Sequence, residues 1–126
     1  MPIDLSRLTQ QKLPTEEVPV PEWAELIGTD KLVVGCMTSA ERGQFENGTP
    51  DKAEDSAKTI IARFVAWCLR EPEGGRMYLE PELAAQHLAA ADNRVMRRLF
   101  RAAKRVNGEG DEAVATAEKN SETGQT

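Results

Sequence analysis

The apolar positions of the chain are most concentrated between residues 51 and 70, where their spacing is helical. They cover more than half of the helical wheel and comprise Ala57, Ile60, Ile61, Phe64, Val65, Trp67, Cys68 and Leu69. A surface helix needs a narrower apolar stripe, so this pattern predicts a central helix that other elements contact on several sides. Arg63 and Arg70 are expected to mark its solvent-exposed edge, and Pro72 follows its end.

Two short stretches before this helix have the composition of strands. In EEVPVPEW, residues 16–23, prolines interrupt the apolar residues. Because proline cannot donate a hydrogen bond to a sheet, this stretch is predicted to be an edge strand or an extended arm. KLVVGCM, residues 31–37, is rich in β-branched residues and is predicted to be a second strand. The two could pair as a small hairpin, which would need the rest of the domain for stability.

Helix-start signals predict the remaining elements. TSAE, residues 38–41, is a capping box that begins a short helix ending near residue 47. Pro81 opens another helix through PELAAQHLAAA, and Asp92 is a suitable N-cap for a helix over residues 93–107. With the central helix, these elements predict a mainly α fold, a small helical domain of about four helices with a short N-terminal β-hairpin or extended arm.

The chain is expected to form one domain with flexible ends. Its 126 residues are a length typical of a single domain. Residues 1–16 are polar and poorly patterned, which predicts a flexible N-terminus, and residues 17–108 are expected to form the helical domain. Residues 109–126 carry five acidic residues against one lysine and have no aromatic residue, leucine or isoleucine, which predicts a disordered acidic tail.

The helix predicted over residues 93–107 has two distinct sides. Its basic residues fall within about 120° of the wheel and are Arg94, Arg97, Arg98, Arg101, Lys104 and Arg105. Apolar residues fill the opposite side and are Val95, Met96, Leu99, Phe100, Ala102, Ala103 and Val106. The apolar side requires a core or a partner. The basic side suits solvent or carboxylates of the same chain, an acidic protein partner, or the phosphates of a nucleic acid.

The composition of this basic side argues against nucleic acid. A recognition helix usually carries Asn, Gln, Ser or Thr among its cations to read base edges, and this side is almost purely Arg and Lys. The formal net charge of −5 repels both nucleic acid and anionic membranes. We therefore expect no nucleic-acid partner and no membrane partner. A small nucleic-acid-binding regulator that uses residues 94–105 stays as an alternative.

No set of residues suggests catalysis or metal binding, so we expect no enzymatic activity, no catalytic or metal site and no cofactor. His87 is the only histidine and has no Cys or carboxylate cluster nearby. Glu80 and Glu82 point to different faces of any helix, which does not suit acid/base catalysis. Cys36 and Cys68 lie in apolar runs and are expected to be small buried hydrophobic residues. No stretch is apolar enough to span a membrane, and MPIDLSRLTQQK lacks a hydrophobic signal core.

The chain resembles the tail assembly chaperones of long, flexible-tailed (siphovirus-type) phages and related prophages. The stretches that carry the resemblance are, in order, KLPTEEVPVPEW, VVGCMTSAERGQFE, ARFVAWCLREPEGGRMYLEPEL and NRVMRRLFRAAKRVNG, and they cover about residues 12–108. Each stretch also has a capping or packing explanation, so the resemblance rests on their order and spacing. The GGRMYLEPEL turn and the strongly basic last helix depart from the family pattern.

The resemblance implies a protein that acts in the host cytoplasm and is absent from the finished virion. Such chaperones bind the long, helical, aggregation-prone tape measure protein, keep it soluble and promote polymerisation of the tail tube around it. The resemblance also implies a homo-oligomer, with the tail tube protein as a further partner. A structural tail or head-completion protein that stays in the particle is the other alternative.

For a helical partner, the amphipathic helix is the candidate binding element. Its candidate apolar anchors and rim charges are Met96, Phe100, Arg97, Arg101 and Lys104. Alternatively, its apolar residues pack inside the domain against Ile60, Phe64 and Trp67, because one face cannot easily serve both roles. Self-association by edge pairing or arm exchange would use EEVPVPEW, with Val18, Val20 and Trp23 as the candidate residues.

Overall fold

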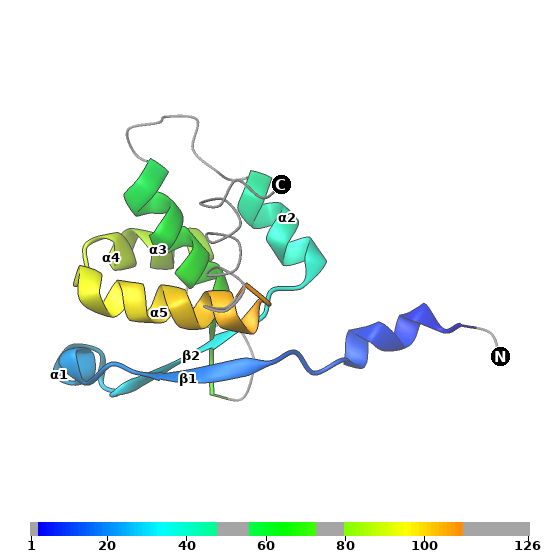
Figure 1. The fold of residues 1–126 in the computed structure, drawn as a ribbon, viewed down its shortest axis with the longest axis horizontal. Helices are drawn as coiled ribbons and strands as arrows, with labels where there is room; N and C mark the ends of the chain where they lie inside the picture. The colour runs from blue at the N-terminus through cyan, green and yellow to red at the C-terminus, as the bar shows by residue number, and fades with distance from the viewer. Residues whose placement is uncertain (1–2, 48–55, 73–79, 110–126) are drawn as a thin grey trace, which may run out of the picture.

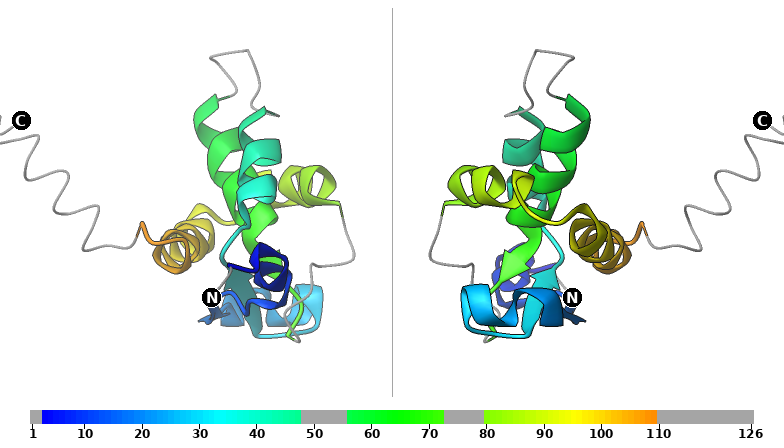
Figure 2. Two further views of the ribbon diagram at one scale, coloured as in Figure 1. Left: turned by 90° about the vertical axis from the view of Figure 1, so that its right-hand side faces the viewer. Right: turned by 90° about the vertical axis from the view of Figure 1, so that its left-hand side faces the viewer.

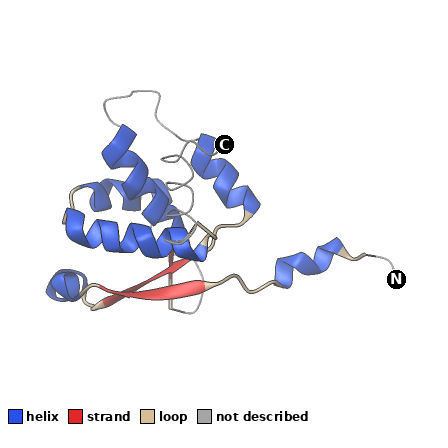
Figure 3. Ribbon diagram, in the orientation of Figure 1, coloured by secondary structure: helices blue, strands red, loops and turns tan. Residues whose placement is uncertain are grey.

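The computed structural model describes residues 3–47, 56–72 and 80–109, and within them the protein is mainly α with a small antiparallel sheet. Figure 1 shows α3, α4 and α5 gathered on one side of the strands, while the N-terminal segment projects from one end of the molecule. Figure 3 shows the same arrangement by secondary structure. The predicted mainly α fold is confirmed, whereas the expected hairpin is part of a three-stranded sheet and the described residues contain more helices than the four that were predicted.

The helices and strands of the described residues have the following bounds. The 3-10 helices η1 and η2 span Leu5–Gln10 and Pro21–Trp23. The α-helices are α1 (Ala24–Ile27), α2 (Ser39–Asn47), α3 (Ser56–Cys68), α4 (Pro81–Ala89) and α5 (Asn93–Val106). The strands are β1 (Thr15–Pro19), β2 (Lys31–Gly35) and β3 (Leu69–Arg70).

β1 and β2 form the predicted hairpin, and β3 extends it into a sheet of order β1-β2-β3. The hairpin is antiparallel, and the backbone N–H of Val20 donates to the carbonyl of Asp30 at 2.7 Å just beyond it. β1 is an edge strand, which accommodates Pro19 because an edge residue needs no donor toward a further strand. The pairing begins at Thr15, two residues before the expected start of the folded domain.

The central helix ends earlier than predicted, at Cys68 rather than at residue 70. Leu69 and Arg70 instead form β3, which pairs antiparallel with β2. The guanidinium of Arg70 donates to the carbonyls of Trp67 and Leu69, each at 2.9 Å, and so occupies acceptors at the helix end. The apolar run did not locate this end because a buried helix and a buried strand are equally apolar. Residues 51–55 of the predicted helix lie outside the described residues.

Both arginines that were predicted to mark the exposed edge of this helix are buried, so that prediction was wrong. Arg63 is 2% exposed and Arg70 is 8% exposed. A wheel position shows only the direction in which a side chain leaves the helix. Carboxylates from other elements meet these guanidinium groups, Glu82 at Arg63 and Glu41 at Arg70, which makes their burial possible.

α3 is the centre of the domain, as its broad apolar surface predicted. It contacts α2, α4 and α5, and Figure 2 shows α4 and α5 on either side of it. α5 also contacts β1 and β2, so its apolar side closes the core between the helices and the sheet. The large buried apolar residues include Val18, Val20, Trp23, Val34, Met37, Phe45, Phe64, Val65, Trp67, Leu69, Val95, Met96 and Leu99.

The ends of α2, α4 and α5 follow the predicted signals. In the capping box, the N–H of Glu41 donates to Thr38 Oγ1 at 3.1 Å and the N–H of Thr38 donates to Glu41 Oε1 at 2.9 Å. Pro81 is the first residue of α4. Asp92 accepts a hydrogen bond at 2.8 Å from the backbone N–H two residues on, at the start of α5. Gly108, with φ of 81°, follows the end of α5.

Replacing Thr38 by alanine is expected to lower the free energy of unfolding by about 1 kcal/mol, because the backbone N–H of Glu41 loses its acceptor. Denaturant unfolding followed by circular dichroism measures this change. Ser39→Ala is the matched control, because Ser39 is the exposed neighbour and forms no side-chain hydrogen bond within the described residues. Equal losses in the two variants would show that the capping hydroxyl contributes nothing of its own.

Candidate partner-binding surfaces

The apolar side of α5 is used inside the domain. Met96, one predicted anchor, is buried and belongs to the core. Phe100, the second, is half-buried, and its ring meets that of Phe64 edge to face with 5.5 Å between the ring centroids. Phe100 therefore packs inside the domain against Phe64, as the packing alternative predicted. Neither predicted anchor projects freely from the surface.

The basic side of α5 holds the EEVPVPEW segment against the domain. Arg98 donates to both carboxylate oxygens of Glu22, at 2.9 and 2.8 Å, and to the carbonyl of Pro19 at 2.9 Å. Arg105 donates to Glu16, with 3.2 Å between Nε and Oε1. The segment is therefore held in place rather than forming a loose arm. The sequence contains these acids but no local signal that pairs them with α5.

These ion pairs keep their carboxylates charged. The hydrogen bond from Arg98 lowers the pKa of Glu22 from 4.5 to about 2. Arg94 donates to Asp92 at 2.8 Å, and this hydrogen bond lowers the pKa of Asp92 from 3.8 to about 2. Both pairs are therefore fully ionised at neutral pH. Pairing within the chain, one of the three uses considered for the basic side, is thus found for Arg94, Arg98 and Arg105.

The other cations of the basic side have different surroundings. Arg97 and Arg101 are exposed, and neither forms an ion pair or side-chain hydrogen bond within the described residues. The ammonium of Lys104 lies 5.1 Å from the centroid of the Phe100 ring, and Lys104 is half-buried there. The five arginines of α5 line a shallow groove of about 430 Å³. Three of these arginines are paired with carboxylates of the same chain. Arg97 and Arg101 are therefore the cations of this groove that could meet a partner.

A second groove, of about 520 Å³, lies where α3, α4 and α5 meet; we call it the helix groove. Its lining is mixed: apolar side chains, among them Ile61, Leu88 and Met96, lie beside the polar Asn93 and Arg97. Met96 is buried but still contributes to the wall, and Arg97 supplies a cation. The structure therefore brings Met96 and Arg97, two of the predicted site residues, to one groove. Arg101 follows about one helical turn later on α5.

The residues predicted for self-association lie inside the domain. Val18, Val20 and Trp23 are all buried, and α5 contacts the strand that carries Val18. Their side chains cannot contact another copy while β1 remains in the sheet. Arm exchange through these residues would first require β1 to leave its place beside β2.

A buried arginine joins α2, α3 and α4. Arg63 donates to the two oxygens of Glu82, at 2.8 and 2.9 Å, and to the carbonyl of Phe45 at 2.9 Å. The indole N–H of Trp67 donates to Glu82 at 2.8 Å. The hydrogen bonds from Arg63 hold the pKa of Glu82 below its usual value. Glu82 was considered in the sequence only as a possible acid/base group, whereas its observed contacts hold the helices together.

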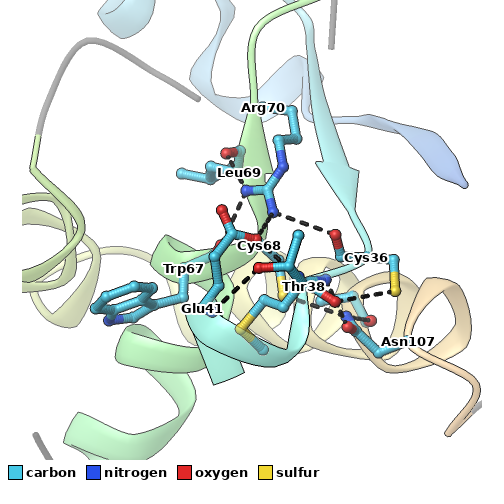
Figure 4. A network of polar contacts seen from close by, with 10 residues as sticks. Cys36, Thr38, Glu41, Trp67, Cys68, Leu69, Arg70 and Asn107 are labelled. Carbon is cyan, nitrogen blue, oxygen red and sulfur yellow. Dashed lines mark hydrogen bonds and ion pairs between the residues drawn. The ribbon is translucent and has the colours of Figure 1, made fainter. Parts of the chain in front are cut away.

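Figure 4 shows a second polar network, which connects β3 to α2 and α5. Arg70 donates to Glu41 at 3.2 Å, so the acid of the capping box also neutralises a buried cation. Asn107 accepts from the backbone N–H of Met37 at 2.9 Å and donates to the sulfur of Cys68 at 3.4 Å. This network positions the end of α5 against the sheet.

The two cysteines and the histidine, which could carry chemistry, lie in different surroundings. Burial raises the pKa of the Cys68 thiol to about 11, so the thiol is protonated and unreactive at neutral pH. Cys68 is the small buried residue that the sequence predicted, whereas Cys36 is half-buried; neither is in a disulfide. His87 is exposed on α4. Among the described residues, His, Cys, Asp and Glu form no group of three that could hold a metal ion.

Comparisons with protein-family models, with curated proteins and with solved structures found no match to this chain. Within the part of the chain that the structure describes, no helix has the length and apolar character needed to cross a membrane. The geometry of the two grooves and the resemblance drawn from the sequence are therefore the observations on which a function can be proposed.

Proposed function

We propose that this protein is a phage tail assembly chaperone. In this role it binds the tape measure protein, keeps it soluble, promotes polymerisation of the tail tube protein around it, and is absent from the mature virion. The observation that carries the proposal is the helix groove, which combines apolar side chains from three helices with Arg97 at its wall. The order of the sequence stretches that resemble tail assembly chaperones supports the same function. The role requires neither catalysis nor a cofactor.

The helix groove suits an amphipathic partner helix with an acidic residue beside its apolar stripe. Apolar side chains of such a helix would pack against Ile61, Leu88 and Met96. An acid on the same helix would meet Arg97 or, one turn along α5, Arg101. Apolar contacts at the centre of an interface contribute most of its affinity, whereas rim charges mainly set orientation and association rate. Binding of this kind is reversible and tolerates moderate salt.

The proposal changes the roles that the sequence suggested for individual residues. Met96 forms part of the wall that receives the partner, rather than an anchor that inserts into it. Phe100 packs on the core, and Lys104 covers its ring. Arg97 and Arg101, the exposed cations of α5 that form no ion pair within the described residues, keep the rim role that was proposed for them.

Co-expression with the tape measure protein of the same genome tests the proposal. The expected result is a soluble complex that survives moderate salt, with the tape measure protein insoluble when expressed alone. A tape measure protein that stays insoluble beside abundant chaperone would contradict the proposal. Detection of this protein in purified virions would instead favour a structural tail or head-completion protein.

The arginine-lined groove on α5 supports the second candidate, a nucleic-acid-binding regulator. Binding to phosphates would weaken by orders of magnitude between low and moderate salt, whereas apolar docking would change little. Three of the five arginines in that groove are already paired with carboxylates, which reduces the charge available to phosphates. Nucleic acid that elutes with the bait at low salt, without the tape measure protein, would favour this candidate.

The double variant Arg97→Glu/Arg101→Glu is expected to weaken capture of the tape measure protein by roughly tenfold, because it reverses both exposed rim charges. Pull-down titration measures the loss, and the melting temperature should be nearly unchanged, since both side chains are exposed. Lys12→Glu/Lys31→Glu makes the same charge change at two exposed lysines away from the helix groove. Equal capture by both double variants would remove the basic side of α5 from the binding surface.

A further inference from the structure

The basic residues of α5 form two stripes along the helix. At 100° per residue, those paired with carboxylates of the same chain lie together, and they are Arg94, Arg98 and Arg105. The others lie within about 60° of the helical wheel, and they are Arg97, Arg101 and Lys104. None of these three forms an ion pair within the described residues, and we call them the unpaired stripe.

Glu109, the last described residue, lies at one end of the unpaired stripe. Its backbone N–H donates to the carbonyl of Lys104 at 2.7 Å, which holds it against the end of α5. Its carboxylate lies 3.7 Å from the guanidinium of Arg42 in α2, and Figure 1 shows this end of α5 close to α2. The sequence that follows Glu109 therefore starts next to the stripe.

The sequence after Glu109 is complementary in charge to the unpaired stripe. Residues 110–126, which we call the acidic stretch, contain four acids and one lysine, and no leucine, isoleucine or aromatic residue. The acids are Asp111, Glu112, Glu118 and Glu122. This composition suits contact with exposed cations and does not suit an apolar groove, because the stretch has no large apolar side chain except one valine.

The acidic stretch is long enough to cover the unpaired stripe of its own molecule. At the helical rise of about 1.5 Å per residue, Arg97 lies roughly 14 Å from the end of α5. An extended chain advances about 3.3 Å per residue, so Glu112 can reach Arg101 and Glu118 can reach Arg97. The covalent link gives this contact an effective concentration on the order of 1 mM, so a weak attraction is enough to form it.

We infer that the acidic stretch of each molecule binds along its own unpaired stripe, with Glu112 at Arg101 and Glu118 at Arg97. The contact neutralises the two exposed arginines while no partner is bound. Because it consists of exposed ion pairs, it weakens as the salt concentration rises. A partner acid that meets Arg97 has to displace the acidic stretch. This consequence rests on the proposed function, whereas the contact itself involves only this chain.

Titration of the full chain with hexaglutamate tests the inference, with binding followed by the NMR resonances of the Arg97 and Arg101 side chains. Hexaglutamate is an acidic peptide that competes with the acidic stretch for the same cations. Replacing the four acids of the stretch by their amides is expected to tighten hexaglutamate binding by roughly fivefold, because the tethered competitor is lost. This variant is Asp111→Asn/Glu112→Gln/Glu118→Gln/Glu122→Gln.

The matched control makes the same change in net charge elsewhere on the molecule. It replaces four exposed acids that form no side-chain hydrogen bond or ion pair within the described residues, as Glu25→Gln/Glu46→Gln/Glu71→Gln/Glu80→Gln. A smaller gain in affinity in this control than in the variant of the acidic stretch supports the inference. Equal gains in the two variants would overturn it, because net charge alone would then explain the tighter binding.

The reciprocal measurement changes the stripe and observes the acidic stretch. Arg97→Gln/Arg101→Gln is expected to shift the backbone NMR resonances of Glu112 and Glu118. Lys12→Gln/Lys31→Gln removes two exposed cations elsewhere and should leave those resonances in place. Unmoved resonances in the arginine variant would overturn the inference. So would shifts that depend on protein concentration, because the stretch would then bind another copy. Neither measurement involves the tape measure protein, so failure of the proposed function is distinguishable from failure of this inference.

Discussion

Replacing Trp23 by alanine is expected to lower the free energy of unfolding by about 3–5 kcal/mol, the usual cost of truncating a buried aromatic side chain. Trp23 is buried where η2 meets the core, and its backbone N–H donates to the carbonyl of Val20 at 2.9 Å. A loss of this size is a large share of the total stability of a small domain. Urea unfolding followed by circular dichroism measures it.

Leu26→Ala is the matched control for this prediction. Leu26 lies three residues further along, and because it is 83% exposed its truncation should change stability by less than about 0.5 kcal/mol. A large stability loss for Trp23→Ala beside a small one for Leu26→Ala would support a core role for the EEVPVPEW segment. Similar stability in the two variants would favour a role in self-association instead. A Trp23→Ala protein that keeps wild-type stability but loses its oligomeric state would return Trp23 to the self-association surface.

The burial of this segment also decides how deletions should be designed. Removing residues 1–24 would delete β1 together with Val18, Val20 and Trp23 from the core. Such a protein is expected to unfold, and its oligomeric state would say nothing about an arm. Removing residues 1–11 leaves β1 in place and deletes only the projecting segment, so its effect on association is interpretable.

Replacing Glu82 by alanine is expected to have the second largest effect, a loss of about 2 kcal/mol, because it leaves the buried Arg63 without its counter-ion. The loss is smaller than for a fully buried pair, because the Glu82 side chain is 53% exposed and water screens the charges. Glu82 also accepts the indole N–H of Trp67, which would lose its partner. Glu80→Ala is the matched control: Glu80 lies two residues earlier, is exposed, and does not cap α4 with its side chain. Equal stability of the two variants would show that the Arg63 pair contributes little.

The Glu82 pair should also make stability depend on pH in a defined direction. Its pKa in the folded protein is lowered below the usual 4.5 by hydrogen bonds from Arg63. The pair therefore stabilises the fold above about pH 4.5 and loses this contribution as pH falls through the lowered pKa. The difference in unfolding free energy between wild type and Glu82→Ala should accordingly shrink below pH 4.5. A difference that stays constant down to pH 2 would contradict this explanation.

Local signals along the chain were sufficient to predict several helices and their ends. The capping box at Thr38, the first proline of α4 and the cap at Asp92 each act within a few residues, and all were placed correctly. The apolar spacing likewise predicted α3 as the central helix and α5 as a helix with two sides. These predictions succeed because helix capping and periodicity depend on neighbours along the chain.

Which polar residues are buried and which cations lack a partner depends on how distant elements pack, and local patterns did not predict it. Arg98 meets Glu22 across 76 positions of the chain and Arg105 meets Glu16 across 89, so no local pattern could pair them. The same holds for the burial of Arg63, because its counter-ion comes from another helix. Helical periodicity gives the direction in which a side chain leaves its own helix. The partners of that side chain depend on how distant elements pack. The candidate site, where Met96 and Arg97 meet Ile61 and Leu88, exists only because three helices converge there.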